Sequence, residues 1–326
     1  MGAIMNGIIG LFRFIFGNKG KIFGTVAVTV CFLAILFPIN DLNDLITSQI
    51  SSLTNRKVFL QFDSMSLSPI GPKLTLEKVF VESSDFPTLT SDLLSLNPSL
   101  MSLISRQPEG SITAQGLFKG DVQISVSTTS KSEAGAARSK IELQAKELNL
   151  KDIREFTNLP VPLLGKLNIS STALADLTLT EQPEMDLNVT ISQFEMPSSS
   201  IDTFATGPIL LPTLKFSSVE MKGKLANGKF TIESAKIGTA KDEFYGDIKG
   251  DFGLTLRNEN NVVRPIFGAY NLDINLKANT AFYQRANFFF LSIADRYKSE
   301  VPGGVQFKFK LSGASFGPPP TYSPLR

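Results

Sequence analysis

The sequence predicts a mainly β protein preceded by a single membrane-spanning helix. Two observations carry this prediction. Residues 22–37 contain no charge, and most residues beyond position 57 alternate between apolar and polar side chains. A period of two is typical of β-strands that bury one face. We therefore divide the chain into a basic, cytoplasmic leader at 1–21, a transmembrane anchor at 22–39 and a β-rich region at 40–326.

The uncharged stretch has nearly the length of a membrane span. With Pro38 and Ile39 it approaches the roughly 20 residues that a helix needs to cross a bilayer core. A cleaved signal peptide is the alternative, but no small-residue cleavage pattern follows the apolar run, which favours an uncleaved anchor. The side chains expected to anchor this helix in lipid are Ile22, Val26, Val30, Leu33 and Phe37.

Charge predicts the orientation of that helix. Arg13, Lys19 and Lys21 precede it, and no acidic residue comes before Asp41. The positive-inside rule then places the leader in the cytoplasm and residues 40–326 across the membrane. Residues 4–16 are apolar but too short to span, so we expect them to lie along the membrane interface.

Composition argues against several classes of function. Of 32 basic residues three are in the leader, which leaves 29 against 30 acidic residues, so nucleic acid is not an expected partner. The chain has no His, and its one Cys is Cys31 within the predicted anchor. Disulfides, the usual zinc sites and His-based catalysis are thereby excluded. We expect no enzyme activity, no cofactor and no metal.

Beyond the anchor, a short helix is expected over residues 41–52, followed by about fourteen strands. Asn227-Gly228 between two alternating runs indicates a type I′ hairpin turn. A phase slip near residues 145–148 indicates a β-bulge. Residues 152–158 are expected to form a helical turn, residues 196–212 a long connection and residues 282–297 a helix.

The late strands carry the strongest apolar face, and we expect it to line a groove if the face is not a filled core. Periodicity alone does not distinguish a closed barrel, a sandwich core and a face covered by lipid. The candidate groove residues are Phe244, Ile248, Phe252, Leu272, Ile274, Leu276, Phe307 and Phe309.

Several stretches together resemble a known family. They are FPINDLNDLI, LSLNPSLMSLISRQPEGSITAQGLFKGDVQI, ELNLKDIREFTNLPVPLLGKLNISS, LPTLKFSSVEMKGKLANGKFTIESAKI and FKFKLSGASFGPPP. In order and spacing they resemble the type II secretion system protein N family (general secretion pathway protein N), in the variety found in Leptospira, Geobacter and Bdellovibrio-like bacteria. The resemblance covers nearly the whole chain and extends distantly to the AsmA-like group.

The resemblance implies a non-catalytic protein of the bacterial inner membrane with a periplasmic β-rich domain. Its implied partners are inner-membrane lipids and other components of the general secretion pathway. The AsmA-like resemblance implies an elongated antiparallel sheet with a few short helices. It also implies an alternative role, in which an apolar groove binds phospholipid and moves it between inner and outer membrane. Neither resemblance supplies a catalytic residue.

Overall fold

The computed structural model describes residues 41–54, 56–68, 72–83, 86–99, 109–131, 137–176, 179–203, 207–259, 262–286, 295–316 and 319–325. The predicted leader and anchor, including Ile22, Val26, Val30, Leu33 and Phe37, lie outside these ranges. Within the ranges, no helix combines the length and apolar character needed to cross a bilayer.

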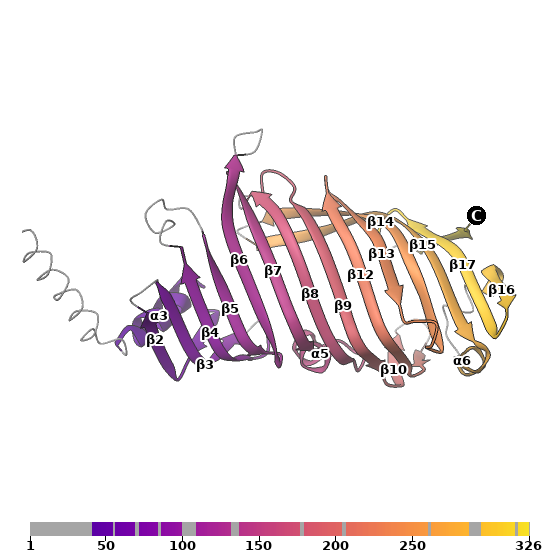
Figure 1. Cartoon of the computed structure of the whole chain (residues 1–326), viewed down its shortest axis with the longest axis horizontal. Helices are drawn as coiled ribbons and strands as arrows, with labels where there is room; N and C mark the ends of the chain where they lie inside the picture. The colour runs from indigo at the N-terminus through magenta and orange to yellow at the C-terminus, as the bar shows by residue number, and fades with distance from the viewer. Residues whose placement is uncertain are drawn as a thin grey trace, which may run out of the picture.

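One long antiparallel sheet forms the body of the protein (Figure 1). Its order is β1-β3-β4-β5-β6-β7-β8-β9-β12-β13-β14-β15-β17-β16, with β2 also paired to β3 and β18 to β17. The mainly β, antiparallel class is thus confirmed. The sixteen strands of this sheet are β1 (Val58–Gln61), β2 (Ser64–Ser68), β3 (Lys73–Ser83), β4 (Leu89–Pro98), β5 (Gly110–Leu117), β6 (Gly120–Lys131), β7 (Ala137–Asn149), β8 (Leu164–Asp176), β9 (Glu184–Met196), β12 (Leu214–Ala226), β13 (Lys229–Ile237), β14 (Phe244–Glu259), β15 (Val262–Asn279), β16 (Lys298–Val301), β17 (Gly304–Gly313) and β18 (Thr321–Pro324).

The described helices are few and short. The predicted first helix is confirmed as α3 (Asp41–Leu53), and the predicted helical turn is α5 (Leu150–Thr157). α6 (Thr280–Arg285) and the 3₁₀ turn η1 (Asp295–Tyr297) lie near the C-terminal end of the sheet.

Strand register places the apolar residues of neighbouring strands on the same side. Ile112 of β5 faces Ile124 of β6, which in turn faces Leu143 of β7. The other side carries charged cross-strand pairs, such as Lys215–Glu195 at 3.0 Å and Lys229–Asp251 at 3.1 Å. We call the apolar side the inner face and the charged side the outer face.

Each end of the inner face is covered by a packed cluster with a helix. Near the N-terminal end, Ile46 and Ile50 of α3 pack against a cluster that includes Leu60 and Leu76. Near the C-terminal end, Phe282 of α6 is 1% exposed and belongs to a cluster of buried aromatic and aliphatic side chains. Two clusters of described residues therefore cover the two ends of the long sheet.

Two local predictions are confirmed. Asn227 and Gly228 both have positive φ, at 52° and 71°, and they join β12 to β13 in the predicted tight turn. The predicted slip is a register shift between Ala145 and Leu148, with Glu147 at φ 57°. Such a bulge lets the apolar residues on both sides of the slip stay on the inner face.

Two other expectations need correction. Helix α6 begins at Thr280, because the Asn279 side chain caps it by accepting a hydrogen bond from the Phe282 N–H at 2.7 Å, and it ends at Arg285. Ala286 is already extended, so residues 282–297 do not form one helix. The expected connection at 196–212 contains a separate hairpin of β10 (Ser199–Thr203) and β11 (Gly207–Leu211). A two-stranded ribbon has only edges, which is where Pro208 is tolerated.

Candidate functional site

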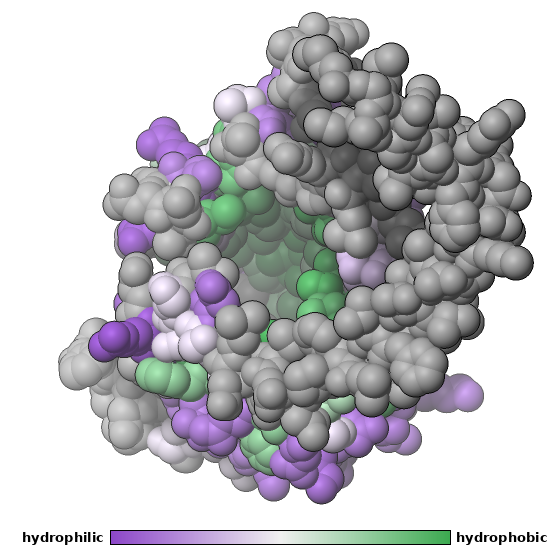
Figure 2. Space-filling view, turned by 90° about the vertical axis from the view of Figure 1, so that its left-hand side faces the viewer, coloured by the Kyte–Doolittle hydropathy of each residue, from purple (hydrophilic) through white to green (hydrophobic). Residues whose placement is uncertain are grey.

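The inner face encloses a hollow with an apolar lining. Viewed along the sheet from its N-terminal end, the hollow shows hydrophobic residues in its depth (Figure 2). Ile112 and Ile124, paired on β5 and β6, are 45% and 36% exposed on this face. A filled core would bury both side chains, so the middle of the inner face is open.

The groove residues expected from the sequence do share the inner face. Cross-strand pairing aligns Ile248 with Ile274 and Phe309, and it aligns Leu276 with Phe307. Their environments differ, however. Five of the eight are buried in the C-terminal cluster, namely Phe244, Ile274, Leu276, Phe307 and Phe309, while Ile248 and Leu272 pack around it.

Phe252 lies farther along β14, with its ring centroid 5.1 Å from that of Phe230. Beside the C-terminal cluster is a cavity of about 280 Å³ lined by Ile237, Phe244, Ile248, Ile274, Leu276, Phe309, Leu311 and Tyr322. Contact between any of these residues and a ligand stays a prediction.

A hairpin arm crosses the hollow. The pairing of β14 with β13 ends at Gly253, which lies opposite Lys229, but β14 continues beyond it. The pairing of β15 with β17 starts only at Tyr270, which lies opposite Gly313, although β15 begins earlier in the chain. Residues 254–259 and 262–267 therefore pair with each other, and neither stretch pairs with a further strand among the residues that the structure describes; we call them the arm. In Figure 1 the far parts of β14 and β15 run behind the strands from β7 to β12.

The arm roofs a second apolar cavity. This cavity has a volume of about 310 Å³ and lies between strands β7, β8, β9 and β12 on one side and the arm on the other. Leu225 in its wall is 2% exposed, whereas Val263 of the arm is 53% exposed. The lining residues are Ile141, Ala173, Ala175, Asp176, Leu179, Pro183, Met185, Leu225, Leu254, Leu256 and Val263.

Gln182, in the loop between β8 and β9, fastens the arm. Its side-chain Nε2 donates to the Leu256 carbonyl oxygen at 3.1 Å, and its Oε1 accepts from the Leu256 N–H at 2.9 Å. This side-chain amide satisfies both backbone groups of Leu256 as a neighbouring strand would. At the base of the arm, the Leu254 N–H donates to the Gly228 carbonyl at 2.9 Å.

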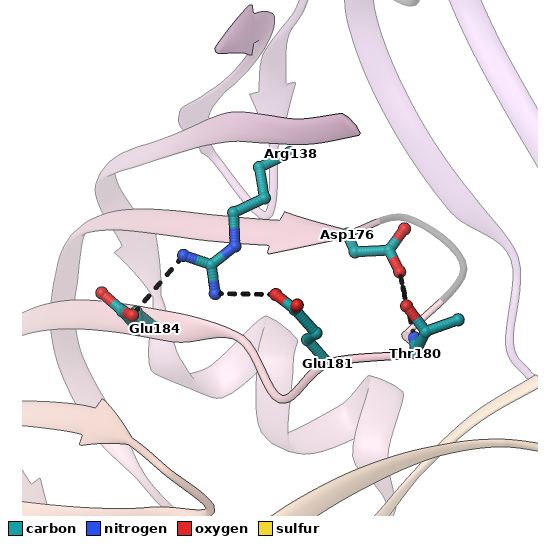
Figure 3. A network of polar contacts seen from close by, with 5 residues as sticks. All are labelled: Arg138, Asp176, Thr180, Glu181 and Glu184. Carbon is teal, nitrogen blue, oxygen red and sulfur yellow. Dashed lines mark hydrogen bonds and ion pairs between the residues drawn. The ribbon is translucent and has the colours of Figure 1, made fainter. Parts of the chain in front are cut away.

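A polar network holds the loop that carries Gln182 (Figure 3). Arg138 of β7 lies between two carboxylates, 3.4 Å from Glu181 and 3.5 Å from Glu184. Asp176 is 5% exposed, and its Oδ2 accepts hydrogen bonds from the Thr180 hydroxyl and, at 3.1 Å, from the Thr180 N–H. These contacts hold residues on both sides of Gln182 in the chain.

Sequence reasoning missed both Gln182 and the exposed pair Ile112 and Ile124. A lone glutamine carries no pattern, and alternation does not report exposure. The arm shows only in the structure, where β14 and β15 have 16 and 18 residues, against 13 for β12 and 9 for β13.

Titratable groups with resolved shifts lie at hydrogen-bonded surface contacts. A hydrogen bond with Lys166 lowers the pKa of Glu147, and a hydrogen bond with Asp63 raises the pKa of Lys78. Within the described ranges no three His, Cys, Asp or Glu residues are grouped as a metal site. What the hollow offers chemically is extended apolar contact.

Comparison with models of known protein families identifies a similarity. The model of a family described as type II secretion system protein GspN-like, Synergistales, matches residues 20–202, which is more than half of the chain. No curated protein and no solved structure matches the chain. The arm, at residues 254–259 and 262–267, lies beyond the matched residues.

Proposed function

Because the chain belongs to the GspN-like family of type II secretion system proteins, we propose that it is a non-catalytic, inner-membrane-anchored component of the type II secretion pathway. Residues 22–39 would form the anchor, and residues 40–326 would be periplasmic. The observation that carries this proposal is the family match over residues 20–202. The uncharged run at 22–37 and the basic leader support the anchor and its orientation.

A deletion strain tests the secretion role. Removing the chain should reduce release of proteins exported by the type II pathway, and the full-length protein should restore it. Normal release in the deletion strain would contradict the proposal. A matched version, with residues 1–39 replaced by a cleaved signal peptide, tests the anchor. It should leave the membrane fraction and restore secretion poorly.

The hollow favours a second candidate function, which is binding or transfer of lipid. Two observations favour it: Ile112 and Ile124 are exposed on the inner face, and the hollow has an apolar lining (Figure 2). Burying apolar surface is worth roughly 25 cal/mol per Å², and an acyl chain laid along this face would gain that energy. The partners in this case would be phospholipids of the inner membrane.

Native mass spectrometry tests the lipid role directly. The full chain is reconstituted in nanodiscs of phosphatidylethanolamine and phosphatidylglycerol and then released. We expect retained phospholipid in the spectrum and transfer of a fluorescent phospholipid between vesicles. Absence of both signals would remove the lipid role and leave the secretion role standing.

A further inference from the structure

The arm turns part of the open hollow into a partly covered site. We propose that the cavity beneath the arm binds a hydrocarbon chain of a lipid, and that Gln182 is the clasp that closes the site. The inference rests on the proposed lipid role of the hollow, and it adds where a chain is held and what holds it there.

The lining decides what kind of occupant fits. Its side chains are carbon-rich except for Asp176, whose Oδ2 accepts hydrogen bonds from Thr180. The backbone groups of β7, β8, β9 and β12 pair with one another in the sheet. A peptide lying against this sheet wall would therefore lose water without gaining partners from the wall for its own N–H and C=O groups. A hydrocarbon chain has no such groups to satisfy.

The size of the cavity limits the occupant to part of a lipid. About 310 Å³ lies at the lower end of the roughly 300–1,000 Å³ typical of ligand pockets. That volume suits a stretch of one acyl chain and not a whole two-chain lipid. The remainder would lie along the hollow toward β6 and β5, since Ile141 of the cavity wall pairs with Val126, which pairs with Gly110.

The clasp is built as a separable contact. Gln182 reaches Leu256 through a side chain, at two hydrogen bonds, and not through a continuous strand ladder. Its loop is fixed by the ion pairs of Arg138 with Glu181 and Glu184. Breaking the two bonds would free the arm to lift while the loop stays in place, which opens the cavity sideways to a chain.

Site-specific photocrosslinking tests the occupant. A benzophenone side chain is introduced in the full chain at Val263 on the cavity side of the arm, at Ile124 in the open hollow, and at Ile266. Ile266 is the matched control, because it lies on the opposite side of the same arm and is 38% exposed. The chains are illuminated in nanodiscs of phosphatidylethanolamine and phosphatidylglycerol, and the adducts are identified by mass spectrometry.

We expect lipid adducts at Val263 and Ile124 and few at Ile266. Adducts at Ile124 but not at Val263 would overturn the cavity site and leave the lipid role intact. If neither position gives a lipid adduct, both the cavity site and the lipid role are refuted. A peptide adduct at Val263, or equal lipid adducts at Val263 and Ile266, would also overturn the inference.

A second set of variants tests the clasp. Gln182→Ala should release a bound fluorescent phospholipid about tenfold to thirtyfold faster, the factor expected for losing two ordinary hydrogen bonds. Gln182→Glu keeps the acceptor but sets a carboxylate oxygen against the Leu256 carbonyl oxygen, so its release rate should be at least as fast as that of Gln182→Ala. The matched control is Gln123→Ala, since Gln123 is exposed on the outer face of β6. An unchanged release rate in Gln182→Ala with native strand content would refute the clasp.

Discussion

Two isoleucines on the same inner face should respond very differently to the same truncation. Ile274 is 8% exposed within the C-terminal cluster, where it lies between Ile248 and Phe309, whereas Ile124 is 36% exposed in the open hollow. Replacing either by alanine removes the same atoms from a β-strand. The loss of intrinsic strand preference is therefore shared, and burial decides the difference.

The magnitudes follow from exposure. At Ile274 the change empties space inside a packed cluster, and such truncations cost about 2–5 kcal/mol of unfolding free energy. At Ile124, full burial of the side chain would be worth about 1.5–3 kcal/mol, and only part of that burial exists. No cavity is created where the hollow is already open. We expect a loss of about 1 kcal/mol for Ile124→Ala and about 3 kcal/mol for Ile274→Ala.

Urea unfolding of the full chain in nanodiscs, followed by the circular dichroism of its strands, measures both losses. The denaturant dependence should stay the same in the two variants, so that the shift in midpoint reports stability alone. Equal losses at Ile124 and Ile274 would refute the open hollow, because they would mean that β5 and β6 face a filled core.

Two further predictions concern the strands around the hollow. Burial acts to raise the pKa of Asp242, but hydrogen bonds from Ser217 and Thr239 outweigh it, so the pKa lies below the ordinary 3.8. The Ser217 hydroxyl donates to the Asp242 carboxylate at 2.7 Å. A lowered folded-state pKa stabilises the fold at pH values above the unfolded-state pKa. Asp242→Ala should therefore cost about 1–2 kcal/mol at neutral pH, and its difference from wild type should shrink as acid titrates the carboxylate; a pH-independent difference in urea midpoint would contradict this account. Gly250 has φ +138°, and a β-carbon there would lie 2.1 Å from the Asn271 carbonyl oxygen. Gly250→Ala should cost at least about 1 kcal/mol, which lowers the thermal midpoint of a chain of this size by about 2 °C or more. An unchanged melting curve would show that the paired backbones of β14 and β15 shift to accommodate the added carbon.

Local chemistry made parts of the fold predictable. The Asn227-Gly228 turn follows from the ease with which these two residues adopt positive φ, and the slip near Glu147 follows from a break in alternation. The hairpin of β10 and β11 escaped prediction because prolines usually argue against strands. The prediction of one helix over residues 282–297 was wrong, because a helical pattern does not show where a side-chain cap starts a helix or where the helix ends.

For the candidate site, the sequence predicted only which side chains share one face of the sheet. Alternation placed Phe244, Ile274 and Phe307 together, and the register confirms that they share one side of the sheet. It did not separate these buried residues from the exposed Ile112 and Ile124, because exposure depends on what lies opposite a face. That opposite surface is supplied by residues far away in the chain.

The sequence by itself determined which side chains share a face, where the tight turn lies, and the uncharged stretch at 22–37 that predicts the anchor. These properties depend on neighbours within a few residues or on the period of a single strand. Tertiary structure alone decided that the inner face is hollow in its middle and filled at its ends. It also decided that the arm reaches Gln182, a partner 74 positions from Leu256. The physical reason is that curvature accumulates over many paired strands, and the register of each pair is set by contacts that no local pattern encodes.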